Sequence, residues 1–388
     1  MIVTIVTDVF GQANNGTTIA AMHLINYLTQ KGHTVRVLCP DADKKGVDNY
    51  YVVPTLNFGV FQPIVDHNGV SLAKGDPMTV ARAIHDADEV HIMMPFALGR
   101  KAVKLCTELG KPVSAGFHVQ AENVTAHFFN WMGNTAINKA VYKDFYKHFY
   151  QYVDAIHYPT QFIRDEFERV VKVKTPGYVI SNGVSSDFQP MAVERDPELK
   201  GKFVIMCTGR YSKEKRQALL IKAAKVSKYS DEIQLIFAGE GPRYNELQRL
   251  VKKTKLKNTP MFRFYKRDEL VKALNMCDLY VHTSEIEIEA ISCLEAISCG
   301  LVPVINDSSK SATRYFALDD KDLFKLNDYK ELAAKIDYWH DHPEEKKARQ
   351  EQYRSFVGQF DFDHCMDEME KMIVATSKIH KEPSHKKK

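Results

Sequence analysis

The chain has 388 residues, of which 44% are hydrophobic and 26% are charged, a balance that is typical of globular proteins with two or three domains. A net charge of +4 without a recognisable nucleic-acid-binding motif argues against a nucleic-acid-binding protein. No apolar run is long enough to cross a bilayer, so we expect a protein that is soluble or peripheral to a membrane.

The first half of the chain alternates buried-strand patterns with amphipathic helical patterns. Residues 2–7 fit a strand, residues 17–31 fit a helix with Ile19, Leu24 and Leu28 on one side, and residues 34–39 fit the next strand. This order predicts one unit of a parallel sheet. Further strands are predicted over 89–94, 112–118, 155–158 and 177–181, and further helices over 80–88 and 102–110.

The same alternation begins again after residue 201. Strands are predicted over 202–207, 234–238, 261–265, 279–282 and 301–305, the last clear strand, and helices over 216–229, 244–254 and 268–275. The two sets predict an α/β fold of two doubly wound domains, with ligands bound at the carboxyl ends of the strands. We place the domains at 1–182 and 183–365, followed at 366–388 by a helix that packs back toward the N-terminal domain and by a basic tail.

The seven cysteines are scattered along the chain and form no Cys-x-x-Cys pair. Their odd number and spacing argue against a disulfide framework and indicate a reducing compartment. Cys39, Cys207 and Cys277 stand in apolar runs, so we expect them to be small core residues.

The most informative motif is a pair of glutamates after the strand over 279–282. Glu287 and Glu295 are eight residues apart, and Glu295 stands between Leu294 and Ala296 in an apolar helical pattern. A carboxylate in such a place needs a partner. The pair can bind hydroxyls of a sugar and of a ribose, while N–H groups at the helix start bind a diphosphate. The alternative is that Glu295 faces solvent.

Two further loops carry residues that suit a diphosphate. Arg210 and Lys215 follow the first strand of the C-terminal domain; arginine suits bidentate contact with phosphate, and lysine supplies a point charge. Gly16, in the first loop of the chain, would let the backbone approach a ligand closely. The alternatives are a solvated basic loop and an ordinary turn glycine.

Polar side chains also follow the strand over 112–118. His118 can hydrogen-bond a sugar hydroxyl, although a lone histidine is more often structural. Gln120, Glu122 and Asn123 add polar groups at the same edge, where an acceptor can bind. The motifs at these positions predict no metal site.

These motifs occur in the order and at the spacings of a known family. They are Asn15-Gly16-Thr17, Phe117-His118, Ile180–Val184, Gly209-Arg210, Glu214-Lys215, Gly239–Pro242, and Glu287 and Glu295 before Gly300. Over almost its whole length the chain resembles the family 4 glycosyltransferases of the GT-B fold, in which two Rossmann-like domains face a cleft. It looks most like bacterial members that make membrane glucolipids, such as diacylglycerol glucosyltransferases.

The resemblance implies a retaining hexosyltransferase that uses a nucleotide sugar and needs neither a metal nor another cofactor. The implied contacts of the donor diphosphate are with Arg210, Lys215 and the N–H groups around Ala290 and Ile291. Glu295 would bind the ribose, Glu287 the sugar and His118 a sugar hydroxyl. Gly16 would close over the phosphates. Of these, His118, Glu287, Arg210 and Lys215 would be catalytic. The chain departs from the family where glycines usually follow the first glutamate, because Ile288 and Ala290 stand there.

The stretch from Asn123 to Tyr152 suggests where an acceptor binds. Lys139, Lys143 and Lys147 recur every four residues and so share one face of a helix. Aromatic residues accompany them: Phe128, Phe129, Trp131, Phe145, Tyr146, Phe149 and Tyr150. The pattern is compatible with a core helix that has a solvated basic face, and with an interfacial surface for anionic lipid. The basic C-terminal tail allows the same two interpretations.

The favoured hypothesis is transfer of glucose from UDP-glucose to diacylglycerol or a glycolipid, by a cytoplasmic protein at the inner face of the cell membrane. The first alternative is a hexosyltransferase for a capsular, exopolysaccharide or cell-wall saccharide. The second is a catalytically idle GT-B protein that only binds a partner.

Overall fold

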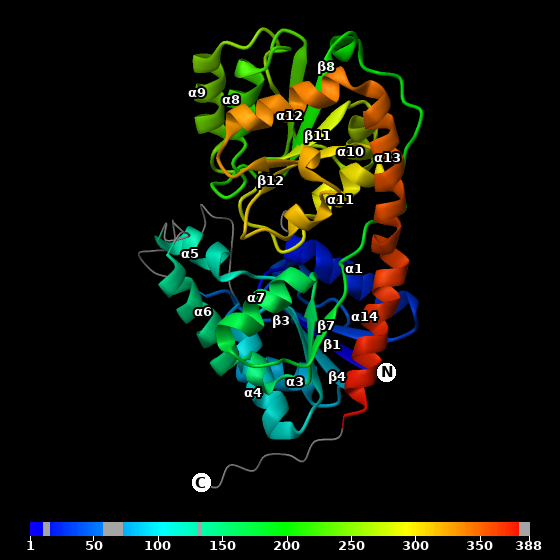
Figure 1. The fold of residues 1–388 in the computed structure, drawn as a ribbon. Coiled ribbons are helices and arrows are strands. Elements are labelled where there is room, and N and C mark those ends of the chain that lie inside the picture. Colours follow the sequence, from blue (N-terminus) through cyan, green and yellow to red (C-terminus); the bar gives the residue numbers. More distant parts are fainter. Residues whose placement is uncertain (11–15, 57–72, 130–133, 380–388) are drawn as a thin grey trace. The chain divides into compact units, whose positions relative to one another are not determined.

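The computed structural model of the chain describes residues 1–10, 16–56, 73–129 and 134–379. The chain forms two compact units, drawn in Figure 1. The N-terminal unit contains Met1–Asn182 and the segment from Cys365 onward, and the C-terminal unit contains Gly183–His364. Each unit has its own parallel sheet covered by helices.

Within the described residues, the sheet of the N-terminal unit has the order β3-β2-β1-β4-β5-β6-β7, and all its strands are parallel. The strands are β1 (Ile2–Val6), β2 (Thr34–Cys39), β3 (Tyr50–Val52), β4 (Glu89–Ile92), β5 (Val113–Gly116), β6 (Ala155–Tyr158) and β7 (Gly177–Val179). Strands β4, β5 and β6 are buried throughout, as expected for strands covered on both faces.

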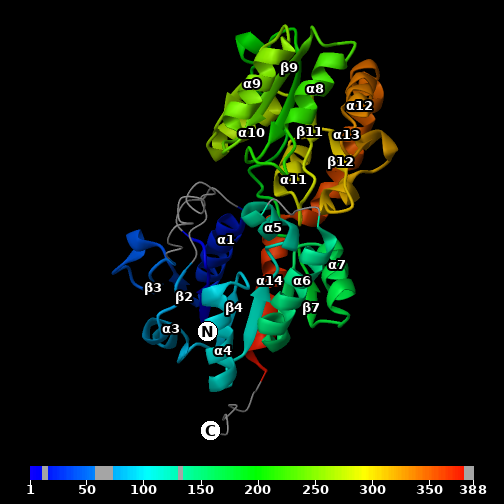
Figure 2. The same ribbon diagram turned by 90° about the vertical axis from the view of Figure 1, so that its left-hand side faces the viewer.

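The helices of this unit are α1 (Gly16–Gln30), α3 (Pro77–Ile84), α4 (Ala97–Leu109), α5 (Ala121–Phe129), α6 (Thr135–His148), α7 (Gln161–Val171) and α14 (Phe362–Ser377). Figure 2 shows α5, α6 and α7 next to one another. Helix α14 returns to α1, where Tyr27 and Lys31 both bind Asp367 and His33 Nε2 lies 2.9 Å from Glu370.

Two details of the predicted N-terminal helices are wrong. Helix α4 begins at Ala97 rather than at residue 102, because Asp8 accepts hydrogen bonds from the N–H groups of Leu98 and Gly99 and so caps the helix from the first loop. Ile19 was placed on the buried side of the first helix, but it is 40% exposed because α1 buries the side that carries Leu24 and Leu28.

The sheet of the C-terminal unit has the order β10-β9-β8-β11-β12-β13 and is also parallel. Its strands are β8 (Phe203–Thr208), β9 (Ile233–Ala238), β10 (Met261–Arg263), β11 (Leu279–His282), β12 (Pro303–Asp307) and β13 (Leu323–Lys325). The expectation that residues 301–305 form the last strand is wrong. Strand β13 follows, and it escapes the sequence pattern because it has only three residues and comes directly after charged residues.

The helices of the C-terminal unit are α8 (Ala218–Val226), α9 (Tyr244–Thr254), α10 (Arg267–Asn275), α11 (Ile291–Ser298), α12 (Tyr329–Asp341) and α13 (Pro343–Val357). Helix α8 packs against α9 and α12, and α11 packs against α13 (Figure 1). The core of this unit includes the fully buried Trp339 and Tyr353. All seven cysteines are buried and none is in a disulfide, which confirms the predicted core role of Cys39, Cys207 and Cys277.

The predicted class, two doubly wound α/β domains, is confirmed. In each sheet the strand order reverses at one point, between β1 and β4 and between β8 and β11. In open α/β sheets, ligands bind at such a switch point, outside the carboxyl ends of the strands. The topology therefore directs attention to the loops that follow these strands in each unit.

Candidate active site

The loops that follow β8 and β11 are tied together at the switch point of the C-terminal sheet. The hydroxyl of Thr283 donates a hydrogen bond of 2.6 Å to the backbone oxygen of Lys215. The backbone N–H of Glu285 donates one of 2.7 Å to the oxygen of Glu214. These bonds fix the backbone that carries Lys215 relative to the start of the glutamate-rich loop.

Glycines allow a second loop, the one after β9, to pack closely beside the β8 loop. Gly209, Gly239 and Gly241 have φ values of +131°, +151° and +155°, which L side chains rarely adopt. A Cβ on Gly239 would lie 2.3 Å from the backbone oxygen of Gly209, and one on Gly241 would lie 2.6 Å from the backbone of Tyr211. The glycines of the Gly239–Pro242 motif are therefore required, because the two loops approach each other too closely for a side chain.

An ion pair stands at the carboxyl end of β11. The ammonium of Lys215 contacts Oε1 of Glu287, and Nε2 of His282 lies 3.2 Å from the same oxygen. Burial opposes ionisation of Glu287, but Lys215 and His282 outweigh it and lower the pKa of the carboxyl to about 2. Burial likewise opposes the charge on Lys215, but Glu287 outweighs it and raises the pKa of the ammonium. Both side chains are therefore charged at neutral pH.

Backbone bonds hold Glu287 in place. The backbone N–H of Glu287 donates to the backbone oxygen of Lys310 at 3.4 Å, and the N–H of Ala312 donates to the backbone oxygen of Glu287 at 2.9 Å. The segment after β12 thus forms one wall of the loop. This support keeps the Glu287 carboxylate in reach of Lys215.

Helix α11 begins directly after this loop. Ala290 is its N-cap residue, with φ 54° and ψ 61°, and the described residues provide no side-chain hydrogen bond to cap it. This left-handed conformation costs alanine about 1 kcal/mol or more relative to glycine. The N–H groups at the start of α11 lack partners within the helix and suit an anion.

Glu295 lies in the second turn of α11 and is partly exposed. Burial of the rest of its side chain raises the pKa of the carboxyl to about 7, an effect that Arg267 at the start of α10 opposes. Within the described residues, no hydrogen bond or ion pair reaches this carboxylate. A carboxyl group held in this way can accept ligand hydroxyls as partners.

In the N-terminal unit, His118 follows β5 and lies beside two other histidines. The centroid of its ring is 5.4 Å from that of His157. A Cβ added to Gly116 would lie only 2.3 Å from Nε2 of His118, so the ring packs directly against this glycine. A cavity of about 10 Å³ is lined by Ala20, Leu24, His91, Met93, His118, His157, Asn182, Met366 and Met369. Burial lowers the pKa of His91 to about 3, that of His157 to about 4, and that of His118 well below its usual value, so all three are neutral.

The predicted acceptor-side residues differ in their exposure. Gln120 and Glu122 are buried, whereas Asn123 is partly exposed. The carboxylate of Glu122 accepts hydrogen bonds from Asn138 at 3.2 Å and from the hydroxyl of Tyr142 at 3.1 Å. Glu122 therefore links α5 to α6 inside the unit, and Asn123 is the one of the three with appreciable surface.

Comparison with known protein families shows to which family the chain belongs. A model described as "Glycosyltransferase Family 4" matches residues 14–188, and one described as "Glycosyl transferases group 1" matches residues 192–356. The two matches cover most of both units. The chain belongs to the family 4 glycosyltransferases.

The chain is similar to a curated protein and to two solved structures. The α-monoglucosyldiacylglycerol synthase of Streptococcus pneumoniae is 24% identical over 314 residues, which cover 77% of this chain and 69% of that protein. Anabaena HepE, solved with UDP and glucose, superposes with a TM-score of 0.72 at 16% identity over 97% of this chain and 100% of that one, and so confirms the GT-B fold. The catalytic domain of the Helicobacter pylori cholesterol-α-glucosyltransferase is 46% identical over 40% of this chain and 96% of that one, with a TM-score of 0.39.

The predicted donor residues of the glycosyltransferase gather mainly in one unit. Six of them surround the switch point of the C-terminal sheet: Arg210, Lys215, Glu287, Ala290, Ile291 and Glu295. Gly16 and His118 belong to the N-terminal unit, at the start of α1 and after β5. Sequence reasoning missed His282, although its position at the end of a strand is the signal that singled out His118.

The predicted basic face of the transferase lies on α6. Lys139, Lys143 and Lys147 are exposed, while Tyr142 and Phe145 of the same helix are buried. Phe149 and Tyr150 are buried too, so these aromatic residues belong to the core. Phe128, Phe129, Trp131 and the tail over 380–388 lie outside the residues whose side chains the structure describes. In the described part of the chain, no helix combines the length and apolar character that a membrane crossing requires.

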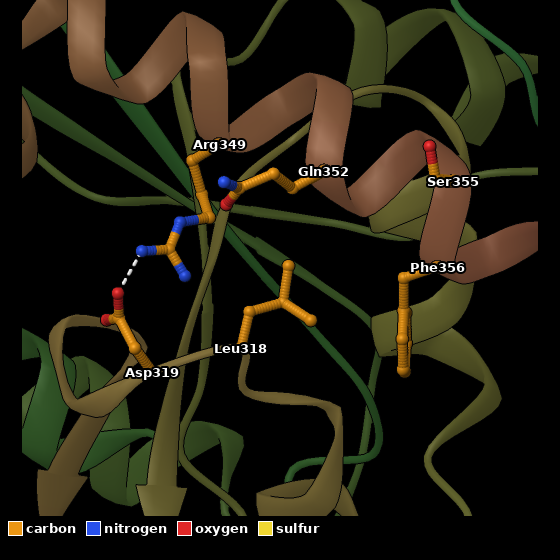
Figure 3. Close-up of a pocket in the computed structure, with 6 residues that line it drawn as sticks. All are labelled: Leu318, Asp319, Arg349, Gln352, Ser355 and Phe356. Carbon is orange, nitrogen blue, oxygen red and sulfur yellow. Dashed lines mark hydrogen bonds and ion pairs between the residues drawn. The ribbon is translucent and has the colours of Figure 1, made fainter.

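A wide surface hollow of about 690 Å³ lies elsewhere in the C-terminal unit and is lined by Leu318, Asp319, Arg349, Gln352, Ser355 and Phe356 (Figure 3). Arg349 pairs with Asp319 and, at 2.8 Å, with Asp322. The hydroxyl of Tyr353 also donates to Asp322, at 2.9 Å. These polar groups bind one another, which favours a structural role for them. The residues at the switch point are therefore the better candidates for the active site.

Proposed function

We propose that the protein is a retaining hexosyltransferase that moves glucose from UDP-glucose to a hydroxyl of a membrane lipid, such as diacylglycerol or a glycolipid. The observation that carries this proposal is the charged pair of Lys215 and Glu287 beside the start of α11. A cation, a carboxylate and the N–H groups at a helix start together match the diphosphate and hydroxyls of a sugar nucleotide.

In the proposed complex, Lys215, Arg210 and the N–H groups at the start of α11 bind the diphosphate. Glu295, which has no hydrogen-bond partner among the described residues, binds the ribose hydroxyls. Glu287 binds hydroxyls of the hexose. The crystal structure of HepE with UDP and glucose supports this class of donor.

The proposed reaction needs no covalent intermediate. The bond between the anomeric carbon and the phosphate oxygen breaks, the acceptor oxygen bonds to that carbon from the same face, and the acceptor proton passes to the leaving phosphate. Negative charge grows on the diphosphate in this step, and fixed cations such as Lys215 and Arg210 stabilise it. Since these cations belong to the protein, we expect no metal requirement. His118 is neutral and can hydrogen-bond a sugar hydroxyl without adding charge.

A lipid acceptor is supported by two independent points. The pneumococcal relative is named for a glucolipid product. The face formed by Lys139, Lys143 and Lys147 is exposed, and each lysine near an anionic membrane surface contributes about 1 kcal/mol. We therefore propose peripheral binding to anionic membrane through α6.

A donor and acceptor screen tests the proposed function. The purified protein is incubated with UDP-, GDP- and ADP-hexoses and with diacylglycerol, monoglucosyldiacylglycerol, cholesterol or a polyprenyl-linked saccharide, with and without EDTA. We expect UDP release with UDP-glucose and a lipid, an α-linked product by NMR, and an unchanged rate with EDTA. Transfer only to the saccharide would replace the lipid acceptor, and no UDP release with any acceptor would contradict the proposal.

Sedimentation with anionic liposomes tests the membrane contact. Replacing Lys139, Lys143 and Lys147 by glutamine should reduce binding at low salt by tenfold or more, from the ~3 kcal/mol that three lysines contribute. The matched control replaces the exposed Lys252, Lys253 and Lys255 at the end of α9, and it should bind like wild type. Equal binding of both triple variants would contradict the proposed role of α6.

A further inference from the structure

A chain of polar contacts leads from the interior of the C-terminal sheet to Glu287. The hydroxyl of Thr208 lies 2.7 Å from that of Tyr280, and the Tyr280 hydroxyl lies 3.3 Å from Nδ1 of His282. Nε2 of His282 lies 3.2 Å from Oε1 of Glu287, the oxygen that Lys215 also contacts. Tyr280 and His282 are at most 1% exposed, so no solvent competes for these bonds.

The partners fix the direction of the chain. Burial lowers the pKa of His282, so its ring is neutral and carries one N–H. An ionised carboxylate only accepts hydrogen bonds, so the proton must stand on Nε2 for the contact with Glu287 to be favourable. Nδ1 is then an acceptor, and the Tyr280 hydroxyl, which also lies 3.4 Å from Oγ of Ser292, can donate to it. Thr208 in turn can donate to Tyr280.

We propose that His282 is a positioning residue for Glu287, which keeps the carboxylate oriented toward the hexose when the ammonium of Lys215 turns to the donor diphosphate. The proposal rests on the proposed function, because it assigns Lys215 and Glu287 to different parts of one sugar nucleotide.

The two donors to Glu287 differ in freedom. Lys215 has a long flexible side chain that is 20% exposed, so its ammonium can move to a new anion. His282 is held on a central strand by its own backbone pairing and by Tyr280, so its N–H stays in place. A buried carboxylate that lost both donors would rotate or take up a proton. His282 thus provides the hydrogen-bond donor that stays with Glu287 when Lys215 moves.

The test compares His282→Gln, whose amide N–H can occupy the place of Nε2–H, with His282→Met, which has a similar length and no donor. We expect His282→Met to lower kcat/KM for the donor by about 10- to 100-fold, the usual effect of losing a hydrogen bond to a charged group, while the Kd for UDP, which lacks the hexose, changes less than threefold. His282→Gln should stay within about fivefold of wild type. In wild type, ¹⁵N NMR should show His282 protonated on Nε2.

The outcomes separate this proposal from the proposed function. Absence of turnover in wild type with every donor and acceptor would contradict the proposed function, while the NMR tautomer would still report on the hydrogen-bond chain. Wild-type kinetics of His282→Met, in a preparation where Glu287→Ala is impaired, would overturn the positioning role. Equal losses of kcat/KM in His282→Met and His282→Gln, with unchanged melting temperatures, would also overturn it. A proton on Nδ1 of His282 in the NMR spectrum would do the same.

Discussion

The two units share one topology but hold buried carboxyl groups in opposite electrostatic states. In the C-terminal unit Lys215 and Glu287 are both charged, and the pKa of Glu287 is lowered to about 2. In the N-terminal unit burial raises the pKa of Asp8 to about 7 and that of Glu89 to about 8. Burial lowers the pKa of His91, His118 and His157 of the same unit, which keeps these three rings neutral. The same fold therefore keeps a carboxyl group charged in one unit and shifts two buried carboxyl groups toward the neutral form in the other.

The difference follows from the partners that each unit offers. Glu287 faces an ammonium and a histidine N–H. Glu89 receives bonds from the backbone and hydroxyl of Ser114, which are neutral and do not offset the burial of a charge. The charged pair suits a diphosphate, as the proposed function requires.

The largest expected effect comes from breaking the ion pair. Lys215→Met leaves Glu287 without its cation in a largely buried site, which typically costs 3–5 kcal/mol, so we expect a loss of ~3 kcal/mol at pH 7 in urea unfolding. The pKa of Glu287 is lowered from about 4.5 to about 2, so its contribution is present above pH 4.5 and is lost as the pH falls through 2. Adding Glu287→Leu should recover most of the loss. A double variant as unstable as Lys215→Met would argue against the pairing.

The close approach of the two glycine loops gives the next largest effect. Gly239→Ala places a Cβ 2.3 Å from a backbone oxygen at φ +151°, so we expect a loss of about 2–3 kcal/mol. Gly16→Ala is the matched control from the N-terminal unit, because a Cβ there meets no atom of the described residues within 4 Å. It should not lower stability, and weaker UDP-glucose binding by this variant alone would support the predicted contact of Gly16 with the phosphates. Equal stabilities of the two variants would contradict the packing described for the loops.

The neutral state of the N-terminal unit is tested through Glu89. Its folded pKa of about 8 exceeds the usual value near 4.5, so its favourable contribution is complete below pH 4.5 and declines as the pH rises to 8. Glu89→Gln mimics the protonated form. Relative to wild type, we expect the variant to gain about 2 kcal/mol between pH 6 and pH 8 in urea unfolding. A pH-independent difference would show that Glu89 is already ionised in the folded protein.

The smallest effect concerns the departure from the family motif. Ala290 has a positive φ at the N-cap of α11, so Ala290→Gly should stabilise the protein by about 1 kcal/mol, read as a rise in the melting temperature. Ala296→Gly is the control inside the same helix and should destabilise. If Ala290→Gly lowered the melting temperature, the described backbone at the start of α11 would be wrong.

The sequence predicts the sheets well because strand and helix periodicities are local properties. It misses what depends on distant residues or on short elements. Strands β3 and β13 have three residues each and directly follow polar or charged residues, which hides their pattern, whereas the equally short β7 and β10 were predicted. The start of α4 is set by Asp8, almost ninety residues earlier in the chain.

The candidate site shows the same limit. The Glu287 and Glu295 spacing identifies the motif, but the contact of Glu287 with Lys215 joins residues 72 positions apart. Glu122 was predicted to meet an acceptor because it follows a strand end, yet Asn138 and Tyr142 of α6 bind its carboxylate. His282 was overlooked because the polar chain that reaches it runs between strands. Partners from other elements, which no periodicity reveals, decide the state of each side chain.

The central claim is that the charged switch point of the C-terminal unit binds the donor, and a crystal structure of the protein with UDP tests it most directly. We expect diphosphate oxygens within hydrogen-bond distance of Lys215 and of the N–H groups at residues 290–292, and ribose hydroxyls within hydrogen-bond distance of Glu295. A diphosphate bound elsewhere, with Lys215 still paired to Glu287 and Glu295 unoccupied, would contradict the account.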